Sequence, residues 1–292
     1  MNFSGITTAL ITAFLKGSLD KKSFLKLLRF QVKEGITQFV LGSTTGEGPT
    51  LEKKEIESLC TWFKNFEKEE GLKLKLLLAT GSCSTKIAIE KTKRAEDLGA
   101  EALLVVTPYY NRPPQSGILS HYEKIAHATK LPLILYNVPS RTACELEINT
   151  IKKLSQIENI IGIKEATGNI AFLKQIKTVV PPDFLLLSGD DLSCAEFFNK
   201  GGHGAISAGS NVLAKELIEL FNSPKSKRAD LFSKYKAFLE ELFKETNPIG
   251  IKQILFEKRV IKSKELRLPL IHKDNPKLQQ SLKQIKKAFP AF

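Results

Sequence analysis

Residues that could carry out carbonyl chemistry stand where short apolar runs end. Lys164 closes the run 159–164, and Tyr136 closes the run 133–136. Burial disfavours the charged form of an amine, and a neutral lysine can attack a carbonyl group to form a Schiff base. A phenol such as that of Tyr136 can move the protons that this reaction requires. A structural interpretation of Lys164, paired with Glu165 or reaching to the rim of the fold, stays open at this point.

Further polar side chains follow other apolar runs. Thr44 and Tyr110 could extend Tyr136 into a relay of hydroxyl groups, and Thr45 with the backbone that follows it could hold a carboxylate. Arg141 offers a planar fork that binds a second carboxylate through two hydrogen bonds. Because each of these residues follows the end of a predicted strand, we expect them to converge on one rim.

Other chemical motifs are not supported. The glycine-rich segment 42–48 lacks the Lys-Ser/Thr pair of a phosphate-binding loop. The Gly-Gly-His-Gly segment 201–204 indicates a turn rather than a metal site. The four histidines and four cysteines do not have the spacing of metal ligands. We therefore expect no metal ion and no other cofactor.

The elements that must position these residues alternate along residues 1–221. Continuous apolar runs separated by amphipathic helical stretches are typical of parallel strands buried on both faces. Asp20, Thr50 and Ser84 read as helix start signals. The expected strands cover residues 6–11, 36–41, 74–79, 102–106, 133–136, 160–164, 184–187 and 205–207. The expected helices cover residues 22–33, 53–69, 85–98, 118–129, 147–154, 170–178, 192–199 and 214–221.

Eight such repeats predict an α/β fold, a closed (β/α)8 TIM barrel formed by residues 1–224. The alternative, an open doubly wound sheet, would call for a dinucleotide fingerprint that the sequence lacks. After residue 224 the strand pattern ends, and residues 225–245, 249–260 and 277–288 read as helices. We therefore expect a C-terminal helical domain over residues 225–292. In a TIM barrel the active site lies at the C-terminal ends of the strands, where the candidate residues stand.

The composition is that of a globular protein with an uneven basic excess. The chain has 292 residues and a formal net charge of +13. Residues 222–292 hold 17 Lys and Arg against 7 Asp and Glu, a net of +10, whereas residues 1–221 hold 27 against 24. Such asymmetry can mark a nucleic-acid-binding surface. Of the 44 basic residues 37 are lysine, which favours a solvated surface over forked phosphate recognition, so we expect no nucleic-acid partner.

The sequence also indicates where the protein works. The first residues lack a basic n-region and carry hydroxyl side chains, which argues against a signal peptide. No apolar run approaches the roughly 18 residues of a membrane span, so no membrane association is expected. The cysteines, scattered without a CxxC pair, read as reduced thiols. These features favour a cytoplasmic protein.

Several sequence blocks resemble those of the 4-hydroxy-tetrahydrodipicolinate synthase (dihydrodipicolinate synthase) family of pyruvate-dependent class I aldolases. The blocks occur in the order of that family, from Gly5 to a C-terminal Asn-Pro-Ile-Gly-Ile-Lys segment. They are Thr-Thr-Gly-Glu at 44–47, Pro-Tyr-Tyr-Asn-Arg-Pro at 108–113, Tyr-Asn-Val-Pro-Ser-Arg-Thr at 136–142, Gly-Ile-Lys-Glu-Ala at 162–166, Ser-Gly-Asp-Asp at 188–191 and the segment 247–252.

The resemblance implies a lyase of lysine and diaminopimelate biosynthesis that condenses pyruvate with L-aspartate-4-semialdehyde. Lys164 would form the Schiff base with pyruvate, and Tyr136 would donate protons. Thr44 would belong to the proton relay together with Tyr110, which in the family reaches in from the neighbouring subunit. A homo-oligomer, commonly a tetramer built as a dimer of dimers, is therefore implied. The positions matching the substrate-binding residues of the family are Thr45, Arg141, the backbone at Ile206, and Gly189 at the same mouth.

Two alternative functions remain. Sugar-acid aldolases of the N-acetylneuraminate lyase or 2-keto-3-deoxygluconate aldolase type share the lysine and the tyrosine but differ around Arg141. A nucleic-acid-binding protein that uses the basic C-terminal region is the alternative from another class; retention on heparin at about 0.2 M salt would support it.

Four positions depart from the pattern of lysine-inhibited members of the family. Those members carry histidines after the position of Thr50, and an asparagine and a glutamate near the loop after the third strand. The corresponding positions here are Lys53, Ile56, Cys83 and Ile87. Positive or apolar groups where a cationic ligand would sit oppose its binding, so we expect activity that L-lysine does not inhibit.

Overall fold

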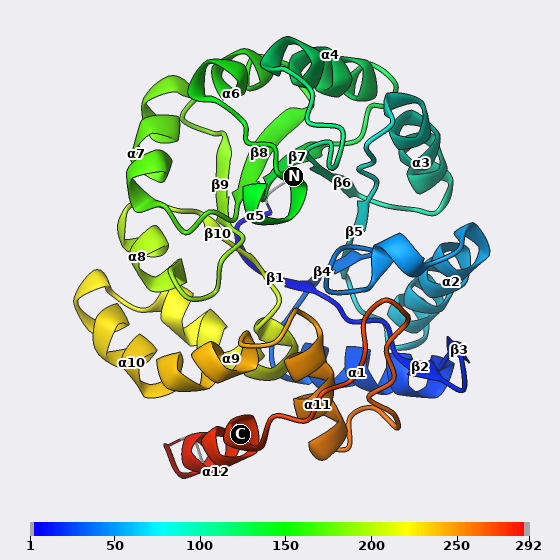
Figure 1. Ribbon diagram of the computed structural model, residues 1–292, viewed down its shortest axis with the longest axis vertical. Coiled ribbons are helices and arrows are strands. Elements are labelled where there is room, and N and C mark those ends of the chain that lie inside the picture. Colours follow the sequence, from blue (N-terminus) through cyan, green and yellow to red (C-terminus); the bar gives the residue numbers. More distant parts are fainter. Residues whose placement is uncertain (1–2, 289–292) are drawn as a thin grey trace. The chain divides into compact units, whose positions relative to one another are not determined.

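The computed structural model describes residues 3–288, with side chains up to residue 283. Within this part of the chain, eight parallel strands close into a barrel in the order β1-β10-β9-β8-β7-β6-β5-β4 (Figure 1). The expected (β/α)8 architecture is therefore confirmed, and all eight expected strands are present with small shifts at their ends. The barrel strands are β1 (Gly5–Ala9), β4 (Gln38–Leu41), β5 (Lys75–Ala79), β6 (Ala102–Val106), β7 (Leu133–Asn137), β8 (Ile160–Glu165), β9 (Leu185–Ser188) and β10 (Gly204–Ser207).

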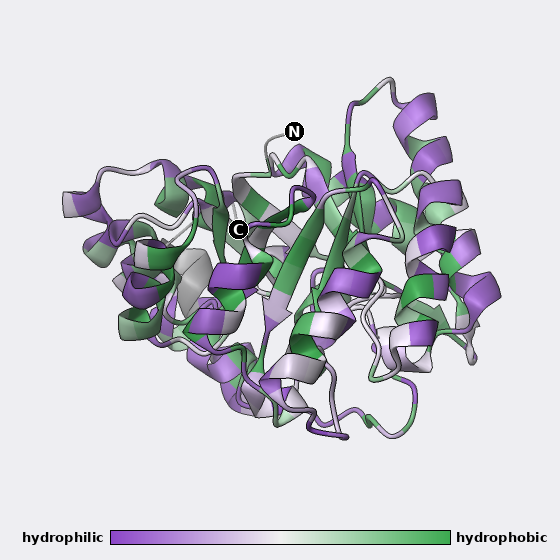
Figure 2. Cartoon of the chain, turned by 90° about the horizontal axis from the view of Figure 1, so that it is seen from above, coloured by the Kyte–Doolittle hydropathy of each residue, from purple (hydrophilic) through white to green (hydrophobic). Residues whose placement is uncertain are grey.

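The helices follow the strands as the hydrophobic periodicity predicts, and they show apolar and polar residues side by side whereas the strands are mainly apolar (Figure 2). They are α1 (Lys21–Lys33), α2 (Lys53–Glu69), α3 (Thr85–Asp97), α4 (Gln115–Ala126), α5 (Pro139–Thr142), α6 (Ile148–Leu154), α7 (Ile170–Val179), α8 (Cys194–Asn199), α9 (Ser210–Asn222), α10 (Lys225–Leu242), α11 (Ile249–Glu257) and α12 (Pro276–Ala288). Among the helices that the structure describes, none is long and apolar enough to cross a membrane.

Contacts along the chain divide it into two compact units. The first comprises residues 1–5 and 75–206, and the second comprises residues 6–74 and 207–292. Six strands, β5 to β10, lie in the first unit, which also holds α3 to α8. Strands β6, β7, β8 and β9 pair in parallel, each with the next, and their residues are almost entirely buried. This packed sheet is what carries the candidate lysine.

A register shift interrupts β8 near its start. Leu133 of β7 pairs with Ile160, whereas the next residue of β7, Ile134, pairs with Gly162. The extra residue on β8 breaks the alternation of side chains before Gly162. Strict alternation of side chains therefore holds only from Gly162 onward, which places Gly162 and Lys164 on one face of β8.

The second unit joins the first strands to the C-terminal helices. Strand β1 pairs with β4, with Thr8 opposite Phe39. The buried Asn211 of α9 reaches back to β1, donating to the carbonyl of Ala9 at 2.7 Å and accepting from the amide of Ile11 at 3.1 Å. Buried polar groups must be satisfied, so these bonds fasten α9 to the first strand.

Two local features differ from the expectations. A hairpin of β2 (Phe14–Leu15) and β3 (Ser18–Leu19) precedes α1, which is capped by Asp20 as expected. Thr50 ends a short 3-10 helix, η1 (Gly48–Thr50), and does not cap α2. Glu52 holds that position in a reciprocal capping box with Glu55, because a glutamate side chain can replace the hydroxyl when both partners bond each other's backbone.

Candidate active site

Lys164 and Tyr136 lie side by side on adjacent strands of the first unit. They are direct register partners of β8 and β7. The Nζ atom of Lys164 is 4.2 Å from the centre of the Tyr136 ring, and the two residues are only 5% and 7% exposed. The amine therefore lies against an aromatic face in a buried site, next to a phenol that can exchange protons.

Glu165 does not neutralise this lysine. Its carboxylate accepts hydrogen bonds from the Nδ2 atom of Asn137 at 2.7 Å and from the backbone amide of Thr167 at 2.6 Å. Burial raises the pKa of the Glu165 carboxyl, and these hydrogen bonds oppose that shift. No ion pair joins Lys164 to an acid among the residues that the structure describes. The structural interpretation of Lys164 as a partner of Glu165 is therefore wrong.

Gly189 leaves the space that the Lys164 side chain fills. A Cβ atom at Gly189 would lie 2.9 Å from Cε and 3.0 Å from Cγ of Lys164, and 2.6 Å from the Cβ atom of Ala166. Such contacts are shorter than van der Waals distances, so only glycine fits.

Ile206 is fully buried on β10, which pairs with β9 through Ala205 and Ser188.

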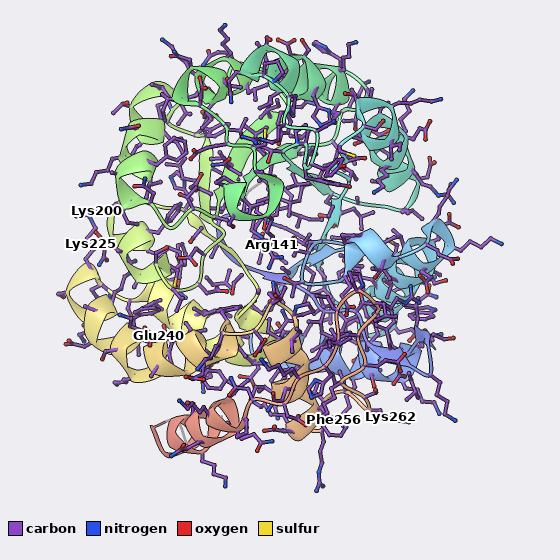
Figure 3. The ribbon with its side chains drawn as sticks, viewed as in Figure 1. Arg141, Lys200, Lys225, Glu240, Phe256 and Lys262 are labelled. Atoms are coloured by element: carbon purple, nitrogen blue, oxygen red, sulfur yellow. The ribbon has the colours of Figure 1, made fainter. Side chains whose placement is uncertain are left out.

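Arg141 stands on α5, directly after β7. The neighbouring Thr142 is buried and accepts a bond from the amide of Cys144, whereas Arg141 itself is exposed (Figure 3). No hydrogen bond or ion pair of its guanidinium group is found among the described residues. The forked donor is thus available for an anionic ligand.

Tyr110 is not packed with the buried pair. It is 92% exposed, on the loop between β6 and α4, and its backbone has a positive φ of 74°. Left-handed backbone is strained for a tyrosine and often marks functional loops. Within one chain, the ring of Tyr110 therefore contributes little to the surroundings of Lys164.

Thr44 and Thr45 belong to the second unit, on the turn after β4. The backbone carbonyl of Thr44 accepts from the amide of Glu47 at 3.1 Å, which closes the turn. Thr45 is 3% exposed, and its Oγ1 atom accepts from the Nδ2 atom of Asn247 at 2.9 Å. The structure thus places Lys164, Tyr136 and Gly189 together in one unit and the threonine pair in the other.

Sequence reasoning missed the supporting amides of both units. Asn137 fixes Glu165 and also accepts from the amide of Leu146 at 3.0 Å, and Asn247 fixes Thr45. Asn137 directly follows Tyr136, so its position beside a candidate residue was a usable signal. The link from Asn247 to Thr45 spans 202 positions, and no periodicity reports a contact of that range.

A separate cavity of about 280 Å³ lies beside α5 in the first unit. Its lining comprises Arg112, Pro113, Gln115, Ala143, Cys144, Glu145 and Glu147. It mixes one arginine with two carboxylates and includes neither Lys164 nor Tyr136. No group of three or more potential metal ligands is found in the described part of the chain.

Comparison with known proteins identifies the family of the chain. The sequence profile of the dihydrodipicolinate synthetase family matches residues 2–288. The 4-hydroxy-tetrahydrodipicolinate synthase of Bdellovibrio bacteriovorus is 41% identical over 292 residues, covering 97% of this chain and 98% of that protein. The solved synthase of Methylacidiphilum fumariolicum SolV superposes with a TM-score of 0.94 at 34% identity, covering 99% of this chain and 98% of that one.

A second solved structure is that of a dihydrodipicolinate synthase from Acinetobacter baumannii, described as chloride-inhibited and complexed with pyruvate. It is 36% identical, covers 97% of this chain and 99% of its own, and superposes with a TM-score of 0.92. Full-length matches of this identity, together with the barrel and its buried lysine, leave one assignment: the chain belongs to the dihydrodipicolinate synthetase family.

Proposed function

We propose that this lyase condenses pyruvate with L-aspartate-4-semialdehyde to give 4-hydroxy-tetrahydrodipicolinate. The observation that carries the proposal is the buried amine of Lys164, which lies against Tyr136 and forms no ion pair with an acid of the described residues. A lysine amine held at the end of a barrel strand beside a phenol is placed to attack a ketone and form a Schiff base.

In the proposed reaction, the Lys164 nitrogen adds to the carbonyl carbon of pyruvate, and the carbonyl oxygen leaves as water. Loss of a methyl proton gives an enamine, whose carbon attacks the aldehyde carbon of the semialdehyde. The amine of the semialdehyde then closes the ring onto the former ketone carbon and releases Lys164. Tyr136 carries the protons of the addition and dehydration steps, with Thr44 as its relay partner.

Three substrate contacts complete the proposal. Thr45 and the backbone at Ile206 hold pyruvate, and Gly189 admits it beside the lysine. Arg141 holds the carboxylate of the semialdehyde, which its free guanidinium group supports. No metal ion or other cofactor is needed for this chemistry.

The exposed Tyr110 is proposed to act in the site of a second copy of the chain. Its 92% exposure supports this role, because a ring that contacts little of its own chain is free to enter a neighbour. A homotetramer built as a dimer of dimers would supply such a neighbour.

The setting proposed for this reaction is the cytoplasm, which the four free cysteines support. The division into a catalytic barrel (1–224) and a C-terminal helical domain (225–292) also remains a proposal. Neither nucleic acid nor a membrane has a part in the proposed function.

The choice of substrate is tested by an acceptor assay. Purified protein is incubated with pyruvate and L-aspartate-4-semialdehyde, and pyruvate loss is followed; a parallel sample receives N-acetylneuraminate, and pyruvate release is followed. Pyruvate consumption only with the semialdehyde is expected. Cleavage of the sugar acid without semialdehyde turnover would assign the chain to the sugar-acid aldolases instead.

A further inference from the structure

The turn that carries Thr44 and Thr45 ends at Glu47, which has a strained backbone and a buried side chain. Glu47 has a left-handed backbone with φ of 54°, although its side chain is only 3% exposed. A Cβ atom at Gly48 would meet the carbonyl oxygen of Gly42 at 1.8 Å, so the turn closes on itself. A left-handed non-glycine residue persists only where surrounding contacts hold it.

Those contacts come from the C-terminal region. Lys252 of α11 is fully buried, and its Nζ atom donates to Oε1 of Glu47 and to the carbonyl of Glu265, the latter at 2.7 Å. The backbone amide of Arg267 donates to the other carboxylate oxygen of Glu47 at 2.9 Å. Burial lowers the pKa of Lys252 to about 8, and Glu47 opposes this shift, so the ion pair persists at neutral pH.

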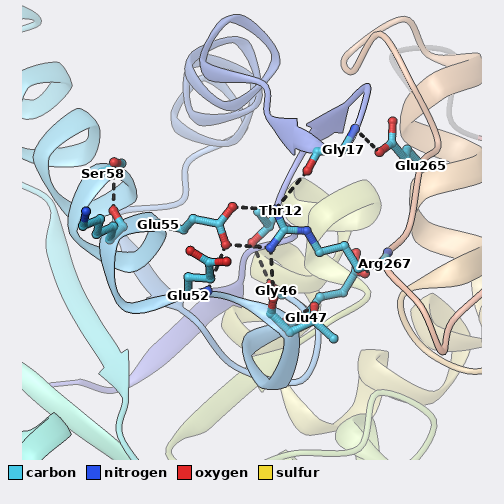
Figure 4. A network of polar contacts seen from close by, with 11 residues as sticks. Thr12, Gly17, Gly46, Glu47, Glu52, Glu55, Ser58, Glu265 and Arg267 are labelled. Atoms are coloured by element: carbon cyan, nitrogen blue, oxygen red, sulfur yellow. Dashed lines mark hydrogen bonds and ion pairs between the residues drawn. The ribbon is translucent and has the colours of Figure 1, made fainter.

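The side chain of Arg267 extends the same anchor. Its guanidinium group donates to Glu55 (Figure 4). It also donates to the carbonyl of Thr50 at 2.9 Å. From the other side of the turn, the Thr12 hydroxyl donates to the carbonyl of Gly46 at 2.7 Å (Figure 4). The turn after β4 is therefore held by Thr12 and by residues of the C-terminal region that lie more than 200 positions away.

The bond from Asn247 to Thr45 has a direction that matters for binding. The Asn247 amide donates, so the Thr45 oxygen is the acceptor and keeps its own proton free. A hydroxyl group in that state donates its hydrogen bond elsewhere, for example to a carboxylate. The Oδ1 atom of Asn247 is buried and has no hydrogen-bond partner among the described residues. The side-chain amide of Asn247 therefore bonds to the protein through its Nδ2 atom, which donates to Thr45.

We propose that Asn247 and the Lys252–Glu47 ion pair are positioning residues for pyruvate, acting through the hydroxyl of Thr45. The C-terminal region thereby sets how the hydroxyl of Thr45 is offered to the substrate. This inference rests on the proposed function, in which Thr45 binds the pyruvate carboxylate.

Two substitutions at Asn247 test the direction of the bond. Asn247→Ala removes the donor and should raise the KM for pyruvate about 10-fold, the value of one lost hydrogen bond. Asn247→Asp should raise the KM for pyruvate further. The introduced carboxylate accepts the hydrogen bond of the Thr45 hydroxyl, so that bond is lost to the substrate, and it also repels the anionic substrate. The kcat at saturating pyruvate should fall much less than kcat/KM in both variants.

Asn275→Ala is the matched control. Asn275 lies in the same region and caps α12 by accepting from the amides of Lys277 and Leu278, but it does not touch the turn. It should lower thermal stability while leaving the KM for pyruvate unchanged.

For the ion pair, the neutral double variant Glu47→Gln with Lys252→Met avoids an unpaired buried charge. This variant should fold, form the Schiff base at Lys164 and show a raised KM for pyruvate.

Borohydride trapping with pyruvate separates the two proposals. If the unmodified enzyme forms the adduct and Asn247→Asp has an unchanged KM, the positioning role is wrong and the proposed function stands. An equal rise of KM in Asn275→Ala would also overturn it, because the effect would then follow stability. Without any adduct in the unmodified enzyme, both proposals fail.

Discussion

At the residue scale, the buried amine of Lys164 is the centre of the proposed chemistry. Lys164 has an aromatic face on one side and a glycine on the other, whereas the nearby carboxylate of Glu165 is taken up by amide donors. The hydrogen bonds of Glu165 to Asn137 and Thr167 thus occupy the carboxylate, and no ion pair between it and Lys164 is found. The exposed guanidinium of Arg141 is the second charged group of the proposal, in which it binds the carboxylate of the semialdehyde.

Substituting Arg141 should separate the two substrates. Arg141→Ala should raise the KM for L-aspartate-4-semialdehyde roughly 10- to 100-fold, which corresponds to the loss of charge-assisted hydrogen bonds. Steady-state kinetics with each substrate varied in turn measure the effect, and Arg141→Lys should recover only part of the loss because it cannot bind bidentately. A change confined to the KM for pyruvate would contradict the assignment.

At the element scale, neighbouring helices of the barrel are joined by buried polar contacts. His121 of α4 lies with its Nδ1 atom 2.9 Å from the hydroxyl of Thr85 on α3, and its Nε2 atom is buried without a partner among the described residues. Burial lowers the pKa of His121 to about 4, below the ordinary histidine value of about 6.5. The unfolded chain therefore takes up a proton at a higher pH than the folded chain does.

This difference predicts an acid limb of stability. As the pH falls from 6.5 to 4, the unfolded state binds the proton first, so the free energy of unfolding decreases by up to about 3 kcal/mol. His121→Phe should flatten this decrease in denaturant titrations across that window. Thr85→Val removes the hydrogen bond but not the imidazole, and it should keep the slope; an unchanged slope in His121→Phe would contradict the prediction.

The elements also show which features a sequence can predict. The eight strands and the barrel followed from apolar runs with polar residues at their ends, and the placement of Lys164 beside Tyr136 followed from strand order. The register shift at Gly162 did not, because alternation assumes an unbroken strand. The close approach of Gly189 to Lys164 and the anchor of Glu47 depend on contacts between distant segments, which local patterns do not encode.

At the scale of the whole molecule, the basic excess and the chemistry lie in different segments. The net charge of +10 belongs to residues 222–292. Only a few of the basic side chains in the protein have a role in the anchor or in the proposed site. In that segment, Lys252 and Arg267 are used inside the protein, while Lys164 and Arg141 lie in the barrel. Net charge is therefore a poor guide to the site of this enzyme.

Regulation by the pathway's end product is expected to be absent. The positions that differ from lysine-inhibited relatives carry Lys53 and Ile56 on α2, Cys83 before α3, and Ile87, which is 45% exposed on α3. These groups offer a lysine ligand a like charge or apolar surface rather than carboxylate or amide oxygens. Initial rates should be unchanged by about 1 mM L-lysine, a concentration that would detect even weak binding; a clear loss of rate would contradict the expectation.

The central claim is that Lys164 is the residue that bonds to pyruvate. The protein is incubated with pyruvate, reduced with borohydride, digested and analysed by peptide mass spectrometry, with Lys164→Arg as the control. The account predicts one pyruvate-derived adduct on the peptide containing Lys164, and none in the control. An adduct on another lysine, or no adduct in the unmodified protein, would contradict it.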